Sequence, residues 1–593
     1  MHHLRRGGMC QRIRMWSFLF ALGLALLGLR LFAIQILLHP RLAKDAERLQ
    51  RVKAQLLGPR GTIYDRNGVP LAFSRISYSI FADPGRIDPA KRPAAKLAPV
   101  VHRSQAEIAS ILGRPGRFEW LRRRADDDMV ARVRELCRAQ PGPPGKVIPG
   151  LRGIGFIAEQ KRLYPYAELA GQTLGFVRDD HLGGAGIELA CDAVLSGRDG
   201  YLVAEVDGSS KRRVIPGRRL RQVDAVSGRD VYLTLDVRIQ EMAEMALRDA
   251  VQRYQAAGGS AIVIDPMTGD VLALANCPAM DPNRYRESAP QRWRNPAVTC
   301  VYEPGSTFKL VAACAALEHT NLTPESPAVC CTGSKAVGRR TIHCVLHGGS
   351  RAHGSLTLRG VVVKSCNIGA ATLAAAVGKR HFYDTLRALG FTQRTGIGLP
   401  AEATGAVPAP ELWRDIRLAN LGFGQGITVT PLQLMAAYGA IAAGGVLPPL
   451  HIIDRIGNGA APPRGGARPF APTQRRGHRA ISARTARIMM DILRDVVTEG
   501  TGKAAQVDGF TVAGKTGTAQ KPTPEMGYAS GRYVGSFVGF APAEDPRIAI
   551  LVIIDEPRGS HYGGVVAAPV FAEIARRGLA YLGLPPRLLA QTR

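Results

Sequence analysis

One long apolar segment, at residues 15–38, lies near the start of the chain. It is about as long as the roughly 20 residues that a helix needs to cross a bilayer, and no second such run follows. An arginine-rich stretch at 5–14 precedes it, so the positive-inside rule places the N-terminus in the cytoplasm. Arg30 interrupts the run near its far end, where the guanidinium can reach the membrane interface. No small-residue cleavage site follows, which predicts a cytoplasmic tail at 1–14 and an uncleaved anchor at 15–38.

The size and charge of the chain limit the remaining possibilities. With 593 residues it exceeds what one hydrophobic core supports, so at least two domains are expected. A composition of 46% hydrophobic and 21% charged residues is ordinary for globular proteins. The formal charge of +30 could indicate nucleic-acid binding, but arginine is spread over every region. A basic surface suits anionic lipid head groups or a negatively charged wall polymer, and we expect no nucleic-acid partner.

Two regions follow the anchor. Residues 39–225 alternate short strand-like runs with basic helical stretches such as 107–114, and a Pro/Gly linker at 141–149 divides them. This region carries none of the reactive motifs described below, which predicts a spacer or docking module. The second region, at 226–585, carries all of them and precedes a short tail at 586–593.

The second region is predicted to form a sheet covered by helices. Its expected strands are 231–235, 261–265, 271–275, 510–513, 533–540 and 548–554, and its expected flanking helices are 236–254 and 569–582. Strands from both ends of one region around a helical middle imply an α+β domain. A Gly-, Pro- and Arg-rich stretch at 457–478 is expected to be a surface excursion.

The first reactive motif is Ser306 with Lys309 three residues later. Pro304-Gly305 break the preceding segment and Ser306 then opens an apolar helix, so the two side chains share one face. Serine is a weak nucleophile until a base takes its proton, and a lysine accepts that proton only when neutral. The positive end of the helix, desolvation and a second cation, Lys515, should all favour neutral Lys309.

The second motif is Ser365 with Asn367, at the head of an apolar helix at 368–377. Two interpretations are open, because short polar side chains at a helix start are often only caps. The capping interpretation is serious for Ser365 and weaker for Asn367. In the functional interpretation, Ser365 relays a proton to the leaving amine and Asn367 binds the substrate amide.

The third motif is Lys515-Thr516-Gly517-Thr518, which continues a strand. Gly517 is expected to leave room for a substrate that lies alongside the strand in extended form. Thr516 and Thr518 would flank that substrate, and the backbone N–H groups of Ser306 and Thr518 would form an oxyanion hole. The three motifs in this order are typical of serine acyl-transfer sites.

Residues 509–516 also match the P-loop pattern G-x-x-x-x-G-K-T. Their intervening residues resemble a strand rather than a flexible glycine-rich loop, and Gly517 follows where a helix should continue. A domain outside the cytoplasm also has no supply of ATP. We therefore expect no nucleotide at this segment.

Ten cysteines are present, and none forms a C-x-x-C pair. Three of them lie in a short stretch together with three histidines: Cys330, Cys331, Cys344, His343, His347 and His353. A zinc site is one alternative, although the usual paired-ligand spacing is missing. A disulfide from Cys330 or Cys331 to Cys344 fits an oxidising outer compartment better.

Several further segments accompany the three motifs. They are 60–68, Leu71-Ala72, Arg162, Tyr164-Pro165, Gly186, Glu188, 233–236, 424–426, 430–434, 562–564 and 568–571. With them the chain resembles the class B penicillin-binding proteins over nearly its whole length, most closely the division-type (FtsI-like) septal peptidoglycan transpeptidases. The resemblance implies one transmembrane anchor, an elongated mixed α/β pedestal at 39–225, and a transpeptidase domain at 226–585 with an antiparallel sheet between helical layers.

The same resemblance implies a two-step acyl transfer. Ser306 attacks the D-Ala-D-Ala end of a stem peptide and releases D-Ala, and an amine of a neighbouring stem captures the acyl-enzyme. β-Lactams imitate the donor and block the serine. No metal or organic cofactor is implied. The implied location is the inner membrane at the division septum, with lipid-linked nascent glycan, an FtsW-type glycan polymerase and other division proteins as partners.

Alternative functions remain open within and beside this family. They are an elongation- or sporulation-type transpeptidase, a D,D-carboxypeptidase and a non-enzymatic β-lactam sensor. A β-lactamase would need a deacylating glutamate, but Glu318 in the E-x-x-N pattern precedes Ser365 instead of following it. Cys366 stands at the centre of S-x-N, where the β-lactamase pattern has Asp, and it is assigned no role.

Overall fold

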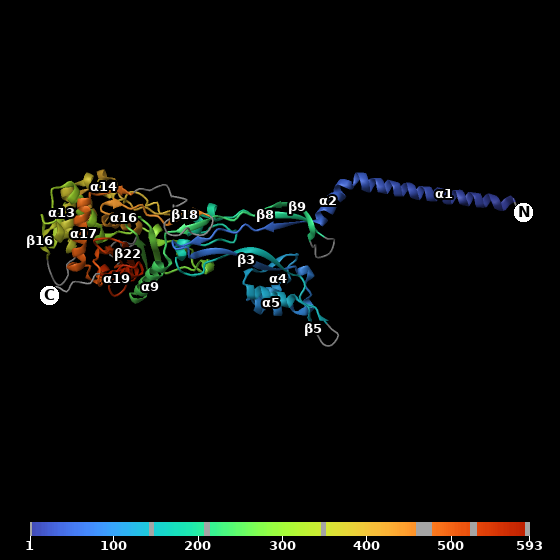
Figure 1. The fold of residues 1–593 in the computed structure, drawn as a ribbon, viewed down its shortest axis with the longest axis horizontal. Helices are drawn as coiled ribbons and strands as arrows, with labels where there is room; N and C mark the ends of the chain where they lie inside the picture. Colours follow the sequence, from blue (N-terminus) through green and yellow to red (C-terminus); the bar gives the residue numbers. More distant parts are fainter. Residues whose placement is uncertain are drawn as a thin grey trace. The chain divides into compact units, whose positions relative to one another are not determined.

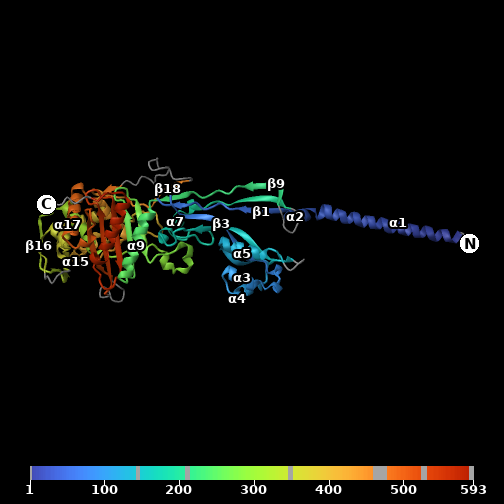
Figure 2. The same ribbon diagram turned by 60° about the horizontal axis from the view of Figure 1, so that its bottom comes forward.

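The structure is a computed structural model that describes residues 3–141, 147–206, 214–344, 352–457, 477–521 and 531–586. The chain divides into two compact units. One consists of Met1–Pro59 with Gly197–Gly228, and the other of Arg60–Ser196 with Arg229–Arg593. Figures 1 and 2 show the path of the chain through each unit. Most of the expected linker at 141–149 and of the expected surface excursion at 457–478 lies outside the described residues.

The first unit begins with the helix α1 (His3–Phe32), which a short π-helical turn and α2 (His39–Gln50) continue. Within it, Ile13–Leu37 has a mean hydropathy of 2.2 and buries none of its surface. It is the one described helix long and apolar enough to cross a membrane, in agreement with the predicted anchor. A three-stranded antiparallel sheet completes the unit, in the order β1 (Arg51–Leu56), β8 (Gly200–Val206) and β9 (Val214–Val223).

The second unit contains two large sheets and, among its described residues, four two-stranded ones. The first has the order β18 (Ile453–Gly457), β10 (Asp230–Leu233), β2 (Ile63–Tyr64), β3 (Pro70–Ala82) and β4 (Glu119–Ala125), and β7 (Ile154–Leu163) also pairs with β3. The helices α3 (Pro93–Val101), α4 (Gln105–Leu112) and α5 (Asp127–Cys137) share one apolar cluster with strands β3 and β4. Ser104 and Glu107 form a capping box at the start of α4, which explains the helix expected at 107–114.

A buried ionic network holds the segment after residue 60 together. Glu188 is fully buried and accepts from Arg60 Nε at 2.7 Å and from Arg162 Nε at 2.6 Å. The hydroxyl of Tyr164 donates to the same carboxylate at 3.2 Å, and Arg60 also pairs with Asp192 at 2.7 Å. One carboxylate between two guanidinium groups joins segments that lie more than a hundred residues apart in sequence. Arg60, Arg162, Tyr164 and Glu188 all belong to the segments that carry the family resemblance. Their shared network is a physical reason for these residue types at these positions.

The second sheet is antiparallel throughout and has five strands. Its order is β12 (Val271–Cys277), β11 (Gly258–Ile264), β22 (Ile548–Asp555), β21 (Tyr533–Ala541) and β20 (Ala513–Gln520). The expected strands at 261–265, 271–275, 533–540 and 548–554 are therefore confirmed. The strand expected at 510–513 begins only at Ala513, and the K-T-G residues continue it inside β20, as predicted.

Both faces of this sheet are covered. Along β11, Val263 packs into the core under α9 (Val237–Arg253) and α19 (Ala568–Tyr581). Its neighbours Ile262 and Ile264 point to the opposite core. The helices that contribute to that core include α11 (Lys309–His319), α13 (Asn367–Val377), α16 (Pro431–Ala442) and α17 (Ala483–Thr498). The two-residue alternation of a strand thus supplies both cores, and the predicted α+β architecture is confirmed.

The ionic network makes a prediction about stability. Glu188→Gln removes the charge that two buried guanidinium groups share, so we expect the free energy of unfolding to fall by about 3 to 5 kcal/mol. Urea denaturation of the purified protein, followed by circular dichroism, measures this change. Glu287→Gln is the matched control, because its pair with Arg284 is solvent-exposed and should leave the unfolding curve where it is. Equal curves for Glu188→Gln and the wild type would contradict the prediction.

Candidate active site

Ser306 lies in a tight 3₁₀ turn, Gly305–Phe308, that runs directly into α11. Residues three apart eclipse one another in such a turn, which aligns Lys309 with Ser306. The amine of Lys309 lies 2.9 Å from Ser306 Oγ, so the predicted pair is confirmed. Gly305 is required here, because its φ is +56° and a Cβ would come within 2.9 Å of the carbonyl oxygen of Thr518.

Ser365 connects this pair to the third motif. Its hydroxyl lies 3.0 Å from Lys309 Nζ and 3.1 Å from Lys515 Nζ, and its carbonyl accepts from Lys309 at 2.6 Å. The residue adopts a left-handed φ of +57°, which is uncommon outside glycine. Ser306, Lys309, Ser365 and Lys515 thus form one continuous hydrogen-bonded chain.

The capping interpretation of Ser365 is wrong. The residue that caps α13 is Cys366, whose sulfur accepts from the backbone N–H of Gly369 at 3.2 Å. This leaves the hydroxyl of Ser365 free to face the two lysines. Asn367 is the first residue of α13, and its side-chain amide donates to the carbonyl of His343 at 2.9 Å.

Lys515, Thr516, Gly517 and Thr518 lie within strand β20, which continues without a break to Gln520. The strand pairs antiparallel with β21 and no helix follows Lys515, so the segment is not a P-loop. Thr516 is fixed by a 2.6 Å hydrogen bond between its hydroxyl and that of Thr501.

The structure shows that glycine is needed at position 517 for a different reason from the one expected. A Cβ at this position would lie 2.4 Å from Ser536 Oγ and 2.9 Å from Thr307 Cγ2. The space beside Gly517 is therefore filled by the protein, and the glycine lets β20 approach the turn that carries Ser306.

Both lysines are almost completely buried, with exposed fractions of 1% for Lys309 and 0% for Lys515. Burial lowers the pKa of Lys309 to about 7. Burial also lowers the pKa of Lys515 well below its ordinary value, and the positive charge of Lys309 acts in the same direction. A substantial fraction of Lys309 is therefore uncharged near neutral pH. Of the three expected causes, desolvation is the one that lowers the pKa of Lys309.

A cavity of about 690 Å³ opens in front of these residues. Ser306, Ser365, Asn367, Thr516 and Thr518 line it, whereas the two buried lysines and Gly517 lie behind its wall. The motifs therefore converge on one site from a helix start, a strained turn and a strand.

The cavity lining also includes residues to which the sequence analysis gave no role. These are Thr501, Lys503, Gln520, Tyr533, His561 and Tyr562, and the rings of Tyr533 and His561 stack with centroids 4.0 Å apart. The segment 562–564 carried a signal as part of the family resemblance, but no chemistry of its own pointed to the cavity. Lys364 and Lys503 add positive charge to the lining, which favours an anionic substrate.

The expected disulfide is not formed. Cys331 and Cys344 are both free, and their sulfur atoms are 3.7 Å apart, compared with about 2.05 Å in a disulfide. Cys330 is exposed, because neighbouring residues of a strand point to opposite faces and Cys331 takes the buried one. His347 lies outside the described residues.

Comparison with known families identifies two domains in the chain. The penicillin-binding protein transpeptidase domain matches residues 259–576, and the penicillin-binding protein dimerisation domain matches residues 55–233. The first match contains all three motifs, and it covers more than half of the chain.

Individual relatives extend over most of the chain. The peptidoglycan D,D-transpeptidase FtsI of Escherichia coli is 32% identical over 97% of this chain and 93% of its own length. Stage V sporulation protein D of Bacillus subtilis is 32% identical over 89% of this chain and 79% of its own length.

A solved structure shares the fold. Penicillin-binding protein 3 of Mycobacterium tuberculosis, crystallised with aztreonam, matches with a TM-score of 0.65 and 31% identity, over 90% of this chain and 99% of the crystallised one. The ordered motifs, the transpeptidase and dimerisation domains and these full-length relatives lead to one conclusion. The chain belongs to the class B penicillin-binding proteins, which are peptidoglycan D,D-transpeptidases.

Proposed function

We propose that this protein crosslinks peptidoglycan stem peptides through an acyl-enzyme on Ser306, with Lys309 as the general base. The observation that carries the proposal is the 2.9 Å contact between Ser306 Oγ and a buried amine whose pKa is lowered to about 7. Uncharged Lys309 takes the serine proton as the oxygen attacks the penultimate D-Ala carbonyl carbon. The peptide bond to the terminal D-Ala then breaks, and the proton leaves on its amine.

Ser365 and Lys515 provide the route for that proton. Ser365 Oγ lies within 3.1 Å of both lysine amines, so it can pass a proton between the base and the leaving group. In the second step, an amine of another stem peptide attacks the ester carbonyl, and Ser306 regains its proton through the same chain. The backbone N–H groups of Ser306 and Thr518 are proposed to hold the oxyanion in both steps.

The position of β20 supports an extended peptide substrate. Among the described strands, β20 ends the sheet order and pairs on one side only, with β21. The other edge of the strand is available for main-chain pairing with a peptide laid along it. Thr516, Thr518 and Asn367 all line the cavity. We assign these residues to substrate binding, and Gly517 to the close approach of strand and nucleophile turn.

We also propose that the enzyme acts in division, anchored by α1 in the inner membrane with its N-terminus in the cytoplasm. We base the septal role, with lipid-linked nascent glycan, an FtsW-type polymerase and other division proteins as partners, on the resemblance to the division-type (FtsI-like) transpeptidases. The chain is also 32% identical to the peptidoglycan D,D-transpeptidase FtsI of Escherichia coli. The equal identity to a sporulation protein keeps the sporulation-type role as the second candidate. β-Lactams are proposed to acylate Ser306, in line with the aztreonam complex of the similar structure.

The acylation proposal predicts the outcome of penicillin treatment. Intact-mass and peptide mass spectrometry should find one adduct, on Ser306, and Ser306→Ala should abolish it. Lys309→Arg keeps the charge but cannot act as a base, so the acylation rate should fall by at least about a hundredfold. The matched control is Lys335→Arg, an exposed lysine, which should acylate at the wild-type rate. An adduct on another residue, or normal acylation of Lys309→Arg, would contradict the assignment.

The pKa of Lys309 predicts the pH dependence of the same reaction. Only the uncharged amine accepts a proton, so the acylation rate should rise with pH through about 7 and level off above it. Below that value the rate should fall about tenfold for each pH unit. Stopped-flow or gel-based labelling with a fluorescent penicillin between pH 5 and pH 9 measures this profile. A flat profile over that range would show that Lys309 is not the base.

The cellular role is tested by a fluorescent fusion to the full-length chain. A septal role predicts a fluorescent band at mid-cell. An elongation-type enzyme would label the side wall uniformly, and a sporulation-type enzyme would appear only in sporulating cells. Incubation of the purified protein with stem peptides separates the reactions. A transpeptidase accumulates crosslinked dimers, a carboxypeptidase accumulates trimmed monomers, and a β-lactam sensor yields neither.

A further inference from the structure

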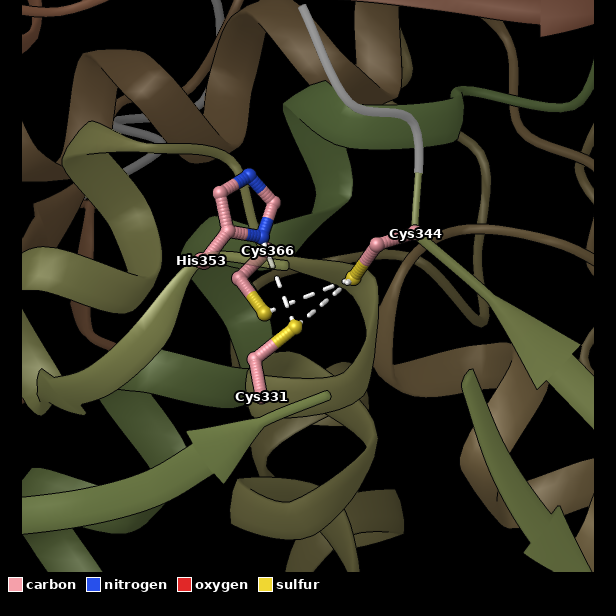
Figure 3. A group of neighbouring side chains, drawn as sticks. All are labelled: Cys331, Cys344, His353 and Cys366. Carbon is pink, nitrogen blue, oxygen red and sulfur yellow. Dashed lines mark hydrogen bonds between the residues drawn. The ribbon is translucent and has the colours of Figure 1, made fainter. Parts of the chain in front are cut away.

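A cluster of three cysteines and one histidine lies directly beside the S-x-N turn (Figure 3). Its members are Cys331, Cys344, His353 and Cys366, and their sulfur and nitrogen atoms all lie within 4.8 Å of one another. Cys331 and Cys366 are buried, and Cys344 and His353 are partly buried. Figure 3 shows the four side chains pointing toward a common centre.

Three of the six distances between these atoms match those of a tetrahedral zinc site. Zinc binds thiolate sulfur at about 2.3 Å and imidazole nitrogen at about 2.0 to 2.1 Å, so neighbouring sulfurs in a tetrahedron are about 3.8 Å apart and sulfur and nitrogen about 3.6 Å apart. In the structure, Cys331 Sγ and Cys344 Sγ are 3.7 Å apart, and Cys344 Sγ and Cys366 Sγ 3.5 Å apart. The distance from Cys331 Sγ to His353 Nδ1 is 3.5 Å.

A disulfide accounts for this arrangement less well. Cys344 lies about equally close to Cys331 and to Cys366, so any one disulfide would leave the third sulfur and the imidazole without a role. Cys330 shows the contrast, because it lies next to Cys331 in the chain but is exposed and outside the cluster. Three convergent thiols with one imidazole are a donor set typical of structural zinc.

We propose that Cys331, Cys344, His353 and Cys366 bind one zinc ion that braces the S-x-N turn. Four protein ligands close the coordination sphere, which is typical of a structural rather than a catalytic zinc ion. The thiols bind as thiolates, so their protons are released to solvent as the metal enters.

The ligands come from separate elements, and the ion would tie these elements together. Cys331 ends strand β13 (Pro327–Cys331), Cys344 follows β15 (Arg340–His343), and His353 precedes β16 (Gly354–Thr357). Cys366 caps α13 and stands between Ser365 and Asn367. Holding Cys366 therefore holds the left-handed Ser365 on one side and, on the other, Asn367 with its contact to His343.

Metal analysis of the full-length protein in detergent tests the site. The protein is incubated with zinc sulfate, desalted and measured by inductively coupled plasma mass spectrometry. We expect about one zinc ion per chain in the wild type, because the described residues offer one such donor set. Cys366→Ser and His353→Ala should lose most of it. Cys330→Ser is the matched control and should keep the wild-type content. No retained zinc in the wild type, or equal loss in Cys330→Ser, would overturn the proposal.

A second measurement needs no variant and so does not depend on variant folding. Cobalt(II) replaces zinc in such sites, and bound thiolates then produce a charge-transfer absorption band. We expect this band in the wild-type protein, and we expect a chelator to lower the melting temperature until zinc is added back. A band that never appears, or a disulfide between any two of the three cysteines in unreduced peptide maps, would overturn the proposal.

The zinc site and the acyl-transfer function can fail separately. Ser306→Ala should lose penicillin labelling and keep its zinc, since Ser306 is not a ligand. On the proposed function, removal of zinc should slow acylation of Ser306 by releasing the S-x-N turn, and added zinc should restore the rate. An enzyme that acylates normally without binding zinc would refute the metal site and leave the acyl-transfer proposal intact.

Discussion

The contact between the buried amine of Lys309 and Ser306 is the interaction around which the site is built. A lysine in water would be charged and unable to take a proton, and burial in the core of the second unit changes that balance. The same burial requires hydrogen-bond partners for the amine, which Ser306 and Ser365 supply. The residues that supply the hydrogen bonds of the buried amine are therefore the same residues that its proposed reactivity involves.

The packing of helices on both faces of the antiparallel sheet makes this arrangement possible. Strands β11 and β22 come from opposite ends of the second region and lie side by side, which brings the K-T-G strand to the sheet edge nearest the nucleophile turn. The helix α11 packs in the core on one face of that sheet and places Lys309 within it. Glycines at 305 and 517 remove the side chains that would keep the turn and strand apart. Small residues at a few positions thus decide whether the turn with Ser306 and the strand with Lys515 can meet.

The cluster of Cys331, Cys344, His353 and Cys366 forms only in the folded chain, and local sequence patterns do not predict it. The sequence shows that cysteines and histidines gather around Cys331 and Cys344, but the missing paired-ligand spacing favours a disulfide over a zinc site there. The sequence does not connect Cys366 with this stretch. Cys366 stands between Ser365 and Asn367 in the S-x-N motif, and its spacing from the other cysteines matches no metal-site pattern. Folding brings it to Cys344, and the sulfur that caps α13 also faces the other two. Gly517 is a similar case, because its need for space is set by Ser536 and Thr307 on other segments.

Local patterns in the amino-acid order are enough to predict the long apolar N-terminal helix, the order of the three motifs, the pairing of Ser306 with Lys309 and most strands of the five-stranded sheet. Each of these depends on interactions between residues within a few turns of one another, such as helical spacing, strand alternation and continuous apolarity. The depth of burial that lowers the pKa of Lys309, the placement of Ser365 between two lysines, the shape of the cavity and the convergence of three cysteines and one histidine depend on contacts between distant segments. Those contacts arise only when the sheet and its helical layers pack, because burial and convergence are properties of the packed core and not of any one segment.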